Sequence, residues 1–328
     1  MFTKSCKFLF ANISKPNIKS LSSNIYDKPL RRVLFNVPGS DQRKIDKAVT
    51  LKDHIDCIVL DIEDGVAINR KQEARDLIKK SVVEQSFGTS ELLVRVNSVD
   101  SGLLEEDIEM LSQCYTYIDG IVIPKVDHPD HLKYISTLLQ NKAPGNKLKF
   151  LASIESARAV VSLKDIICYS ETTSAVIPYQ LEALIFASED YCADTGITRT
   201  PTANELLYAR SAIVNHSIAY GLQAIDMVCI NYKDQEALKK ETREGIQMGF
   251  HGKQAIHPNQ IDIIRDSFRP SKEKFEFASK IIEQNDIHQA LGKGAFEVDG
   301  KMIDMPMVKW AKNILSIESF YPPRQEDQ

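Results

Sequence analysis

The sequence has 328 residues, of which 43% are hydrophobic and 26% charged, the composition of an ordinary globular protein with one large core or two modest ones. The net charge of −4 argues against a nucleic-acid partner. No apolar run approaches the roughly 18 residues of a membrane span, so a membrane association is not expected either. The six cysteines lack CxxC or zinc-finger spacing and are predicted to be reduced thiols.

The N-terminal segment differs from the rest of the chain. Residues 1–26 contain four lysines, five serines and no acidic residue. Basic, serine-bearing and acid-free leaders are typical of mitochondrial transit peptides, although these usually favour Arg over Lys. We expect residues 1–30 to be a disordered targeting leader and the mature protein to reside in the mitochondrial matrix.

After the leader, short apolar runs alternate with amphipathic stretches. The runs predicted as strands are Val33–Val37, Ile55–Asp61, Leu92–Val96, Gly120–Pro124, Phe150–Ile154, Ala183–Ala187, Ala224–Cys229 and Lys253–Ile256. The helices predicted between them are Asp41–Leu51, Arg70–Glu84, Leu104–Gln113, Asp130–Gln140, Ala157–Leu163, Glu205–Tyr220 and Asp234–Met248. Eight buried strands alternating with helices predict an α/β fold, a (β/α)8 TIM barrel over residues 31–268. An open doubly wound sheet is less favoured because no GxGxxG sequence follows the first strand.

The alternation ends near Phe268. A helix is predicted over Glu273–Glu283 and another over Met305–Ile317. Between them, Ala295–Val298 and Lys301–Ile303 form a predicted hairpin that turns at Asp299–Gly300. Residues 269–328 are therefore expected to form a C-terminal helical and hairpin extension outside the barrel, which the family resemblance described below implies closes over an active site.

Charged residues follow the predicted strands. The strand ends carry Asp61, Glu63 and Asp64, then Arg95, Lys125, Glu155, Glu189 and Asp190, Asp226 and His257. In a barrel enzyme the loops after the strands build the reactive face. Any one of these residues could be a helix cap or a solvated loop charge, but their recurrence predicts an active site at this face.

Two of these acids suit a metal ion. Glu155 and Asp190 follow the fifth and sixth strands, which are neighbours in a closed barrel. Oxygen ligands without His or Cys favour a hard ion such as Mg2+, which often takes only one or two carboxylates and keeps several waters.

Several motifs in this order resemble the citrate lyase β-subunit family of the HpcH/HpaI aldolase superfamily. They are Val37-Pro38-Gly39, Leu60-Asp61-Ile62-Glu63-Asp64-Gly65, Arg95-Val96-Asn97, Pro124-Lys125, Ile154-Glu155-Ser156, Ser188-Glu189-Asp190-Tyr191, Gly249–Pro258 and Met302–Pro306. The resemblance covers roughly residues 31–318. It implies that Glu155 and Asp190 hold Mg2+ and that Arg95 stabilises charge on a substrate oxygen. The acidic cluster of Asp61, Glu63 and Asp64 would orient Arg95 and metal-bound waters.

The resemblance also implies a coenzyme A site. Arg43 and Lys47, four residues apart on the first predicted helix, match positions that contact the coenzyme phosphates, and Ile256 and His257 match a segment bordering the coenzyme. Asn36 stands where relatives carry a Tyr that contacts substrate, so the pocket is expected to differ there. For Arg43 and Lys47, an ordinary charged helix face is the alternative.

Asp304 is the acid–base group that the resemblance implies, and a helix N-cap is its alternative role. In the family this Asp reaches a neighbouring subunit's barrel in a homotrimer. The implied reaction is reversible, Mg2+-dependent cleavage of citramalyl-CoA to pyruvate and acetyl-CoA, with synthase chemistry giving malate as a possible side activity. Two alternatives stay open: a class II aldolase acting on free oxo acids or hydroxy acids, and a non-catalytic barrel subunit.

Overall fold

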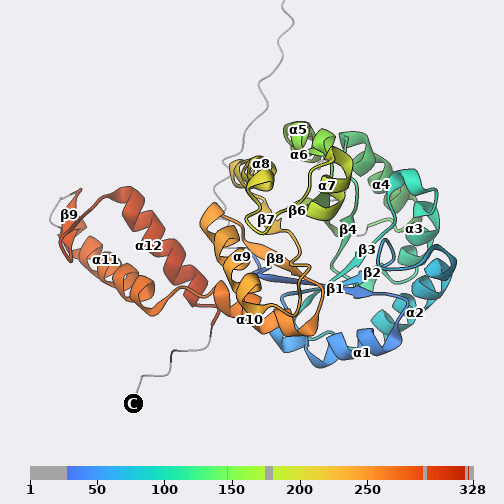
Figure 1. The fold of residues 1–328 in the computed structure, drawn as a ribbon, viewed down its shortest axis with the longest axis horizontal. Helices are drawn as coiled ribbons and strands as arrows, with labels where there is room; N and C mark the ends of the chain where they lie inside the picture. Colours follow the sequence, from blue (N-terminus) through green and yellow to red (C-terminus); the bar gives the residue numbers. More distant parts are fainter. Residues whose placement is uncertain (1–27, 146, 174–179, 291–293, 322–323, 325–328) are drawn as a thin grey trace, which may run out of the picture.

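The computed structural model describes residues 28–145, 147–173, 180–290, 294–321 and 324, so the predicted leader lies almost wholly outside the described residues. Strands β1 to β8 form a closed barrel in which each strand runs parallel to its neighbours and β8 pairs with β1 (Figure 1). The predicted TIM barrel is therefore confirmed. The barrel strands are β1 (Val33–Pro38), β2 (Cys57–Asp61), β3 (Glu91–Arg95), β4 (Gly120–Ile123), β5 (Lys149–Ile154), β6 (Gln180–Phe186), β7 (Gln223–Asp226) and β8 (Gly252–Ala255).

Helices surround the barrel, and every predicted helix is present with shifted ends. They are α1 (Gln42–Thr50), α2 (Lys71–Glu84), α3 (Leu104–Ser112), α4 (Pro129–Lys142), α5 (Ala157–Val161), α6 (Leu163–Thr173), α7 (Ser188–Thr195), α8 (Leu207–Ala219), α9 (Gln235–Met248) and α10 (Ile261–Ser267). Helices α6, α7 and α10 were not predicted. Among the described residues, none of the helices combines the length and apolar character needed to cross a bilayer.

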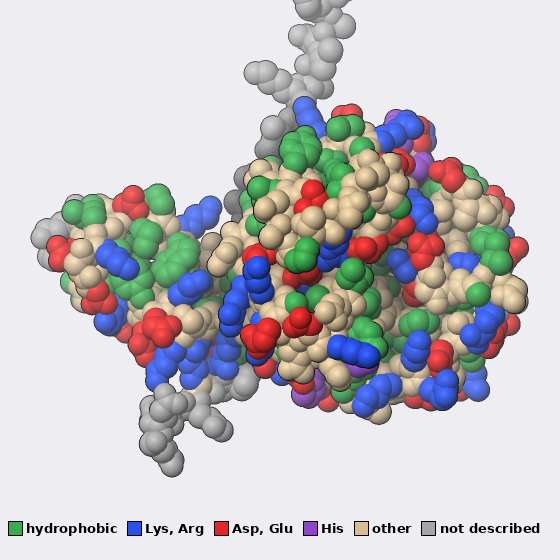
Figure 2. Space-filling model, in the orientation of Figure 1, with side chains coloured by type: hydrophobic (Ala, Val, Ile, Leu, Met, Phe, Trp, Pro, Cys, Tyr) green, Lys and Arg blue, Asp and Glu red, His purple; other side chains and the backbone are tan. Residues whose placement is uncertain are grey.

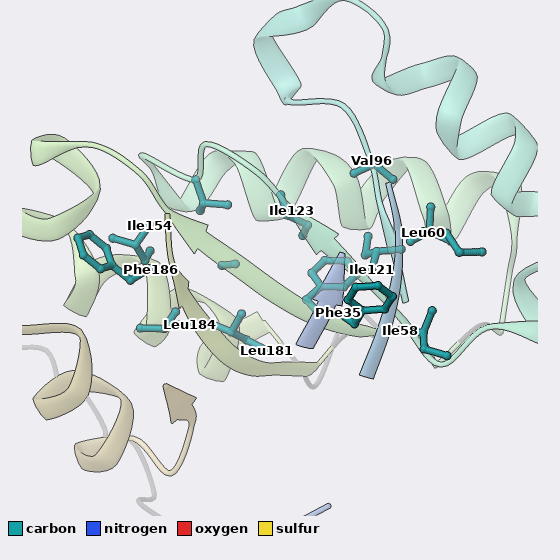
Figure 3. Packing of buried hydrophobic residues seen from close by; sticks show 14 of the residues in the cluster. Phe35, Ile58, Leu60, Val96, Ile121, Ile123, Ile154, Leu181, Leu184 and Phe186 are labelled. Carbon is teal, nitrogen blue, oxygen red and sulfur yellow. The ribbon is translucent and has the colours of Figure 1, made fainter. Parts of the chain in front are cut away.

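Side chains alternate between the two faces of each barrel strand, as the pleat requires. The outward set packs against the helices in a continuous apolar layer, part of which Figure 3 shows around Phe35, Ile58 and Leu60. The inward set fills the middle of the barrel with a separate apolar cluster: Leu34, Cys57, Val59, Leu93, Val122, Leu151, Ala183, Ile185 and Ile225. Residues two positions further along these strands therefore point into the barrel at its carboxyl end.

An ion-pair network lies at the amino end of the barrel. The Arg31 side chain is fully buried, and its Nε and Nη2 atoms donate to the Glu91 carboxylate over 2.6 and 2.8 Å. Its Nη1 atom donates to Gln223 over 2.7 Å. Lys149 pairs with the same Glu91 carboxylate over 2.8 Å. This end of the barrel is consequently occupied by paired charges. The other end, where the strands finish, is called the mouth of the barrel below.

The C-terminal extension projects from the side of the barrel (Figure 1). It consists of α11 (Lys272–Ala290), the hairpin β9 (Phe296–Val298) and β10 (Lys301–Ile303), and α12 (Met305–Glu318), as predicted apart from the longer α11. It has its own small hydrophobic core. The Glu318 carboxylate holds its base through Arg269 at 2.6 Å and Arg324 at 2.6 Å. Apolar side chains show on the visible face of this extension (Figure 2).

Candidate active site

Strand alternation brings four of the predicted residues to the inside of the barrel mouth. Asn36 follows the inward Leu34 by two positions, Asp61 follows Val59, and Arg95 follows Leu93. Glu155 stands four positions after the inward Leu151. Asp61 lies directly opposite Arg95 in the β2–β3 register. The motifs that lie far apart in the sequence therefore converge at one end of the fold.

Asp61 and Arg95 form a two-pronged ion pair at the centre of the mouth. Arg95 Nε donates to Asp61 Oδ1 over 2.7 Å, and Nη2 donates to Oδ2 over 2.7 Å. Glycines allow the chain to approach this carboxylate closely: a Cβ on Gly65 would lie 2.3 Å from Asp61 Oδ2, and one on Gly39 would lie 2.8 Å from the Asp61 carbonyl oxygen. This pairing holds the guanidinium plane fixed and leaves part of its fork of five N–H donors free for another ligand.

Glu63 links the acidic loop to two cations. One of its oxygens accepts from Lys125 Nζ at 2.7 Å, and the other lies 3.3 Å from Arg95 Nη1. Lys125 also approaches Asp64 at 3.5 Å, and its backbone is left-handed with φ 54°. The amine of Lys71, on α2, donates to the carbonyl oxygens of Ile62 and Glu63 over 2.7 and 2.8 Å. The loop is therefore held by side chains from α2, β3 and the β4 loop.

Glu155 is a carboxyl group buried in the mouth. It is 4% exposed, and its Oε2 atom is buried without a hydrogen-bond partner among the described residues. Burial, the largest cause, and repulsion from the Asp190 carboxylate, the second largest, raise the pKa of Glu155 to about 8. Burial and the Asp64 carboxylate also raise the pKa of Asp190, which lies in the first turn of α7. A cation would relieve both carboxylates.

Arg95 contributes positive charge to the same place. Burial opposes that charge, but the Asp61, Glu63 and Glu155 carboxylates outweigh it and raise the pKa of Arg95, so this guanidinium remains charged. In the part of the chain that the structure describes, no three His, Cys, Asp or Glu side chains converge as a ready-made metal cage. The arrangement that fits a metal is a pair of carboxylates with further positions left for water and substrate.

Two charged residues predicted at the mouth lie elsewhere. Asp226 is buried against α8, where it pairs with Arg210 over 2.5 Å. It directly follows the inward Ile225, so the strand pleat turns it outward. Glu189 is half exposed and forms an ion pair with Arg199. Only Asp190 of this acidic pair acts electrostatically on Glu155.

The residues predicted to border the coenzyme lie around the end of β8. Asn36 Nδ2 donates to Gln254 Oε1 over 3.3 Å. Ile256 is 42% exposed. The His257 ring stacks on Tyr232 with 4.7 Å between ring centroids, and its Nδ1 accepts from the Asn259 amide at the start of the 3-10 turn Pro258–Gln260. His257 thus has a structural role at this turn.

Arg43, Lys47 and Asp304 are not part of the convergent group. Arg43 and Lys47 are both exposed on α1, and the Arg43 side chain is 92% exposed. Asp304 caps α12, accepting from the Met307 amide over 3.2 Å. It belongs to the extension, which projects away from its own barrel (Figure 1). The alternative role of Asp304 as a helix cap is therefore observed in this structure.

The sequence-based site omitted several residues that hold the mouth together. Lys125 follows a predicted strand without a predicted role, and nothing in the neighbouring sequence indicates its left-handed backbone. Lys71 lies on a helix and is recognisable only through its tertiary contacts. Gln260 is fully buried and bonds the Cys229 carbonyl oxygen over 2.8 Å and the Ile256 amide over 2.8 Å. Gln260 stands three residues after His257, the spacing of a capping box, and this spacing is the sequence signal that could have identified it.

Comparison with known proteins places most of this chain in a known family. Residues 31–258 match the family model described as HpcH/HpaI aldolase/citrate lyase. The chain is 40% identical over 94% of its length to "Citramalyl-CoA lyase, mitochondrial" of Rattus norvegicus, covering 91% of that protein. It is 30% identical over 88% of its length to "Citrate lyase subunit beta" of Leuconostoc mesenteroides subsp. cremoris, covering 93% of that protein.

Solved structures give the same result. A crystal structure of CitE from Mycobacterium tuberculosis, in complex with magnesium, acetoacetate and coenzyme A, matches with a TM-score of 0.71 at 25% identity. The alignment covers 88% of this chain and 98% of CitE. The resemblance inferred from the motifs is thus confirmed. The chain belongs to the HpcH/HpaI aldolase/citrate lyase family.

Proposed function

We propose that this protein is a Mg2+-dependent carbon–carbon lyase that cleaves citramalyl-CoA to pyruvate and acetyl-CoA in a reversible reaction. One observation carries the proposal: two carboxylates, Glu155 and Asp190, are held with raised pKa values beside the charged Arg95 at the barrel mouth. The names of the relatives point to the same chemistry, since they include citramalyl-CoA lyase and a CitE complex with magnesium and coenzyme A.

Glu155 and Asp190 are the residues that fit a magnesium ion. The Oε2 atom of Glu155 is buried and has no hydrogen-bond donor among the described residues, and burying a carboxylate oxygen in this way is costly unless a cation binds to it. When bound, Mg2+ would supply a Lewis acid for the substrate oxygens and so require no covalent lysine adduct. The acidic cluster of Asp61, Glu63 and Asp64 would orient Arg95 and the waters bound to the metal. Asp61 would do so by fixing the Arg95 side chain.

Arg95 is the residue best placed to stabilise charge on the oxygen that becomes the ketone of pyruvate. Its plane is fixed by Asp61, so no reorganisation of the guanidinium is needed when negative charge develops. A lysine could not reproduce this, because it lacks the planar fork. Cleavage requires the hydroxyl group to lose its proton, so that its oxygen forms the ketone as the adjacent carbon–carbon bond breaks. The electron pair of the broken bond stays on the acetyl-CoA carbon, which then receives a proton.

The coenzyme would lie along the rim formed by β1, α1 and the end of β8. Arg43 and Lys47 provide exposed positive charge for its phosphates, and the exposed Ile256 with the ring of His257 provides a border for the rest. Asn36 faces Gln254 at this rim in place of the larger aromatic residue of relatives. Because a smaller side chain leaves more space, the pocket around the acyl end of the substrate should differ in shape from that of relatives.

Asp304 would donate the proton to the acetyl-CoA carbon, or remove one in the condensation direction, from the extension of a neighbouring subunit in a homotrimer. Three features support this arrangement. The extension projects from its own barrel, Asp304 is at the hairpin end, and the adjacent Met302 and Met305 are 72% and 63% exposed. Exposed apolar residues around a functional acid suit a surface that is covered on assembly.

The main test is release of acetyl-CoA from citramalyl-CoA by purified protein with and without Mg2+. We expect turnover that is lost with a chelator, restored by Mg2+, and absent from Glu155→Ala. The free acid citramalate is the comparison substrate: equal cleavage of it would instead indicate a class II aldolase. No turnover of any such ester by folded, metal-loaded protein would indicate a non-catalytic barrel.

A mixing experiment tests the placement of Asp304. Asp304→Ala and Glu155→Ala are each expected to be inactive alone. In mixed oligomers, an intact barrel from the Asp304→Ala chain can receive Asp304 from the Glu155→Ala chain, so part of the activity should return. If Asp304 served its own barrel, a mixture would stay inactive, because no single chain would carry a complete site. Light scattering of the wild-type protein would give the number of subunits.

We infer a mitochondrial matrix location from the leader predicted over residues 1–30 and from relatives that are named mitochondrial. The full-length chain fused to a fluorescent protein should colocalise with a matrix marker. A fusion beginning at Lys28, where contacts with the barrel already occur through Glu182, should remain outside mitochondria.

A further inference from the structure

Arg199, in the loop after α7, joins the start of that helix to the rest of the barrel. Its side chain is 10% exposed, and it donates to four different groups. Nη1 bonds Ser188 Oγ at 3.1 Å and also the Glu189 carboxylate. Nη2 bonds the carbonyl oxygen of Val228 at 3.0 Å and Glu241 Oε2 at 2.8 Å. The four acceptors come from α7, the loop after β7, and α9.

The first turn of α7 depends on these contacts because it lacks an ordinary cap. The N-cap residue is Ala187, and no side chain in the described part of the chain accepts from the amides of this turn as a cap. Ser188 and Glu189, which Arg199 holds, directly precede Asp190 in the sequence. Fixing these two residues fixes the backbone from which the Asp190 carboxylate projects.

The far side of Arg199 is anchored to the barrel wall. Glu241, which accepts from Arg199, also accepts from Lys253 Nζ over 2.5 Å. Lys253 is on β8, is 1% exposed, and donates in addition to the Met227 carbonyl oxygen over 2.7 Å. The chain of contacts therefore runs from the first turn of α7 through one guanidinium to a buried amine on the barrel.

We propose that Arg199 is a positioning residue that sets the place of Asp190 for metal binding. The inference rests on the proposed function only in taking Asp190 as a metal ligand. A fork of five donors can hold two adjacent residues of α7 and two groups behind it at once, which a lysine amine cannot do. Residues that orient metal ligands in this way typically contribute about 10–100-fold to metal affinity.

The variant to test is Arg199→Lys, with Arg32→Lys as its matched control. Arg32 is 11% exposed and forms a two-pronged pair with Asp56, at 2.9 and 2.7 Å, at the amino end of the barrel. Both changes remove a nearly buried fork and keep the charge. Affinity for Mg2+ would be measured by calorimetry, with Mn2+ spin resonance as a second probe. We expect Arg199→Lys to weaken metal binding about tenfold or more and Arg32→Lys to leave it unchanged.

Hydrogen exchange of the metal-free proteins gives a readout that does not depend on metal binding. The amides of 188–195 should exchange faster in Arg199→Lys than in wild type and at the wild-type rate in Arg32→Lys. If Arg199→Lys does not fold, Glu189→Gln at a half-exposed position removes the negative charge from one of the four contacts and should weaken metal affinity by a smaller factor. Wild-type affinity and exchange in the folded Arg199 variant would overturn the proposal. If wild type itself bound no divalent ion, the proposed function would fail, and exchange would still decide whether Arg199 orders α7.

Discussion

The buried charge of Glu155 should make the metal-free protein less stable as the pH rises. A pKa raised from 4.5 to about 8 means that the folded protein holds this proton more tightly than the unfolded chain does. The stability contributed by the proton is fully present below pH 4.5 and is lost as the pH rises through 8. Over the whole range it amounts to about 5 kcal/mol, of which about 4 kcal/mol falls between pH 5 and pH 9.

Glu155→Gln removes the titrating group and keeps the shape of the side chain. Denaturant unfolding of metal-free protein from pH 5 to pH 9 should show wild type losing about 4 kcal/mol relative to this variant. Mg2+ should restore the stability of wild type at high pH, by about 2.7 kcal/mol at a hundred times its dissociation constant, and should not stabilise the variant. Parallel pH curves for the two proteins, or equal stabilisation by Mg2+, would refute the reasoning.

Glu91→Gln is a control at the other end of the barrel. Burial would raise the pKa of Glu91, but the hydrogen-bonded ion pair with Arg31 lowers it to about 2. A lowered pKa gives stability that is present above 4.5 and lost only as the pH falls through 2, so it is constant between pH 5 and pH 9. Glu91→Gln should therefore lower stability at every pH in this range without changing the slope.

The remaining predictions concern catalysis and coenzyme binding. Arg95→Lys should reduce kcat by about 10²–10³-fold while calorimetric Mg2+ affinity stays near wild type; unchanged turnover would exclude a role in charge stabilisation. Asp304→Asn retains a good helix cap and removes the acid, so it should lose about 10²–10⁴-fold in kcat, as Asp304→Ala does, and an active Asn variant would indicate a cap alone. The double variant Arg43→Ala with Lys47→Ala should raise KM for the coenzyme A ester, most at low salt, and leave kcat unchanged; a KM independent of both residues would place the phosphates elsewhere. Gln260→Met should raise KM for the same ester, because the amides of the segment bordering the coenzyme lose their shared acceptor, and a wild-type KM would separate this segment from the coenzyme.

Most of the barrel could be predicted from sequence because most of its strands are largely apolar on both faces, although β8 contains Lys253 and Gln254. Where both faces are covered, the strand becomes a continuous hydrophobic run, and all such runs were found. The ends were less certain. β6 begins at Gln180 rather than Ala183, because the register shifts beside Glu182, which turns toward Arg31 at the amino end of the barrel. Helix α7 was missed because its first turn is the acidic motif itself, whose residues suggested a loop.

The site could be predicted only as far as the strand pleat and the motifs allowed. Alternation accounts for Asp61 and Arg95 pointing inward, and the same rule, applied to Ile225, would have placed Asp226 outside the mouth. It fails at Lys125, where the left-handed backbone breaks the alternation and brings the amine to Glu63. Contacts that join separate elements, such as those of Lys71 or Arg199, leave no periodic trace in the sequence.

Residues placed by strand alternation and residues that join separate elements have different roles at the mouth, for a physical reason. Among the groups that would hold the metal or the reacting oxygen, Arg95 and Glu155 lie at strand ends, where the closed barrel fixes their spacing, and the strands themselves are held by a continuous apolar layer. Asp190 is the exception, because it begins a helix and no strand fixes it. A ligand in that position needs an external brace, and the guanidinium of Arg199 is the brace that the fold provides. We therefore predict different effects in the two cases. Substitution of residues that hold Arg95 in place should change turnover, whereas substitution of residues that hold Asp190 in place should change metal affinity first.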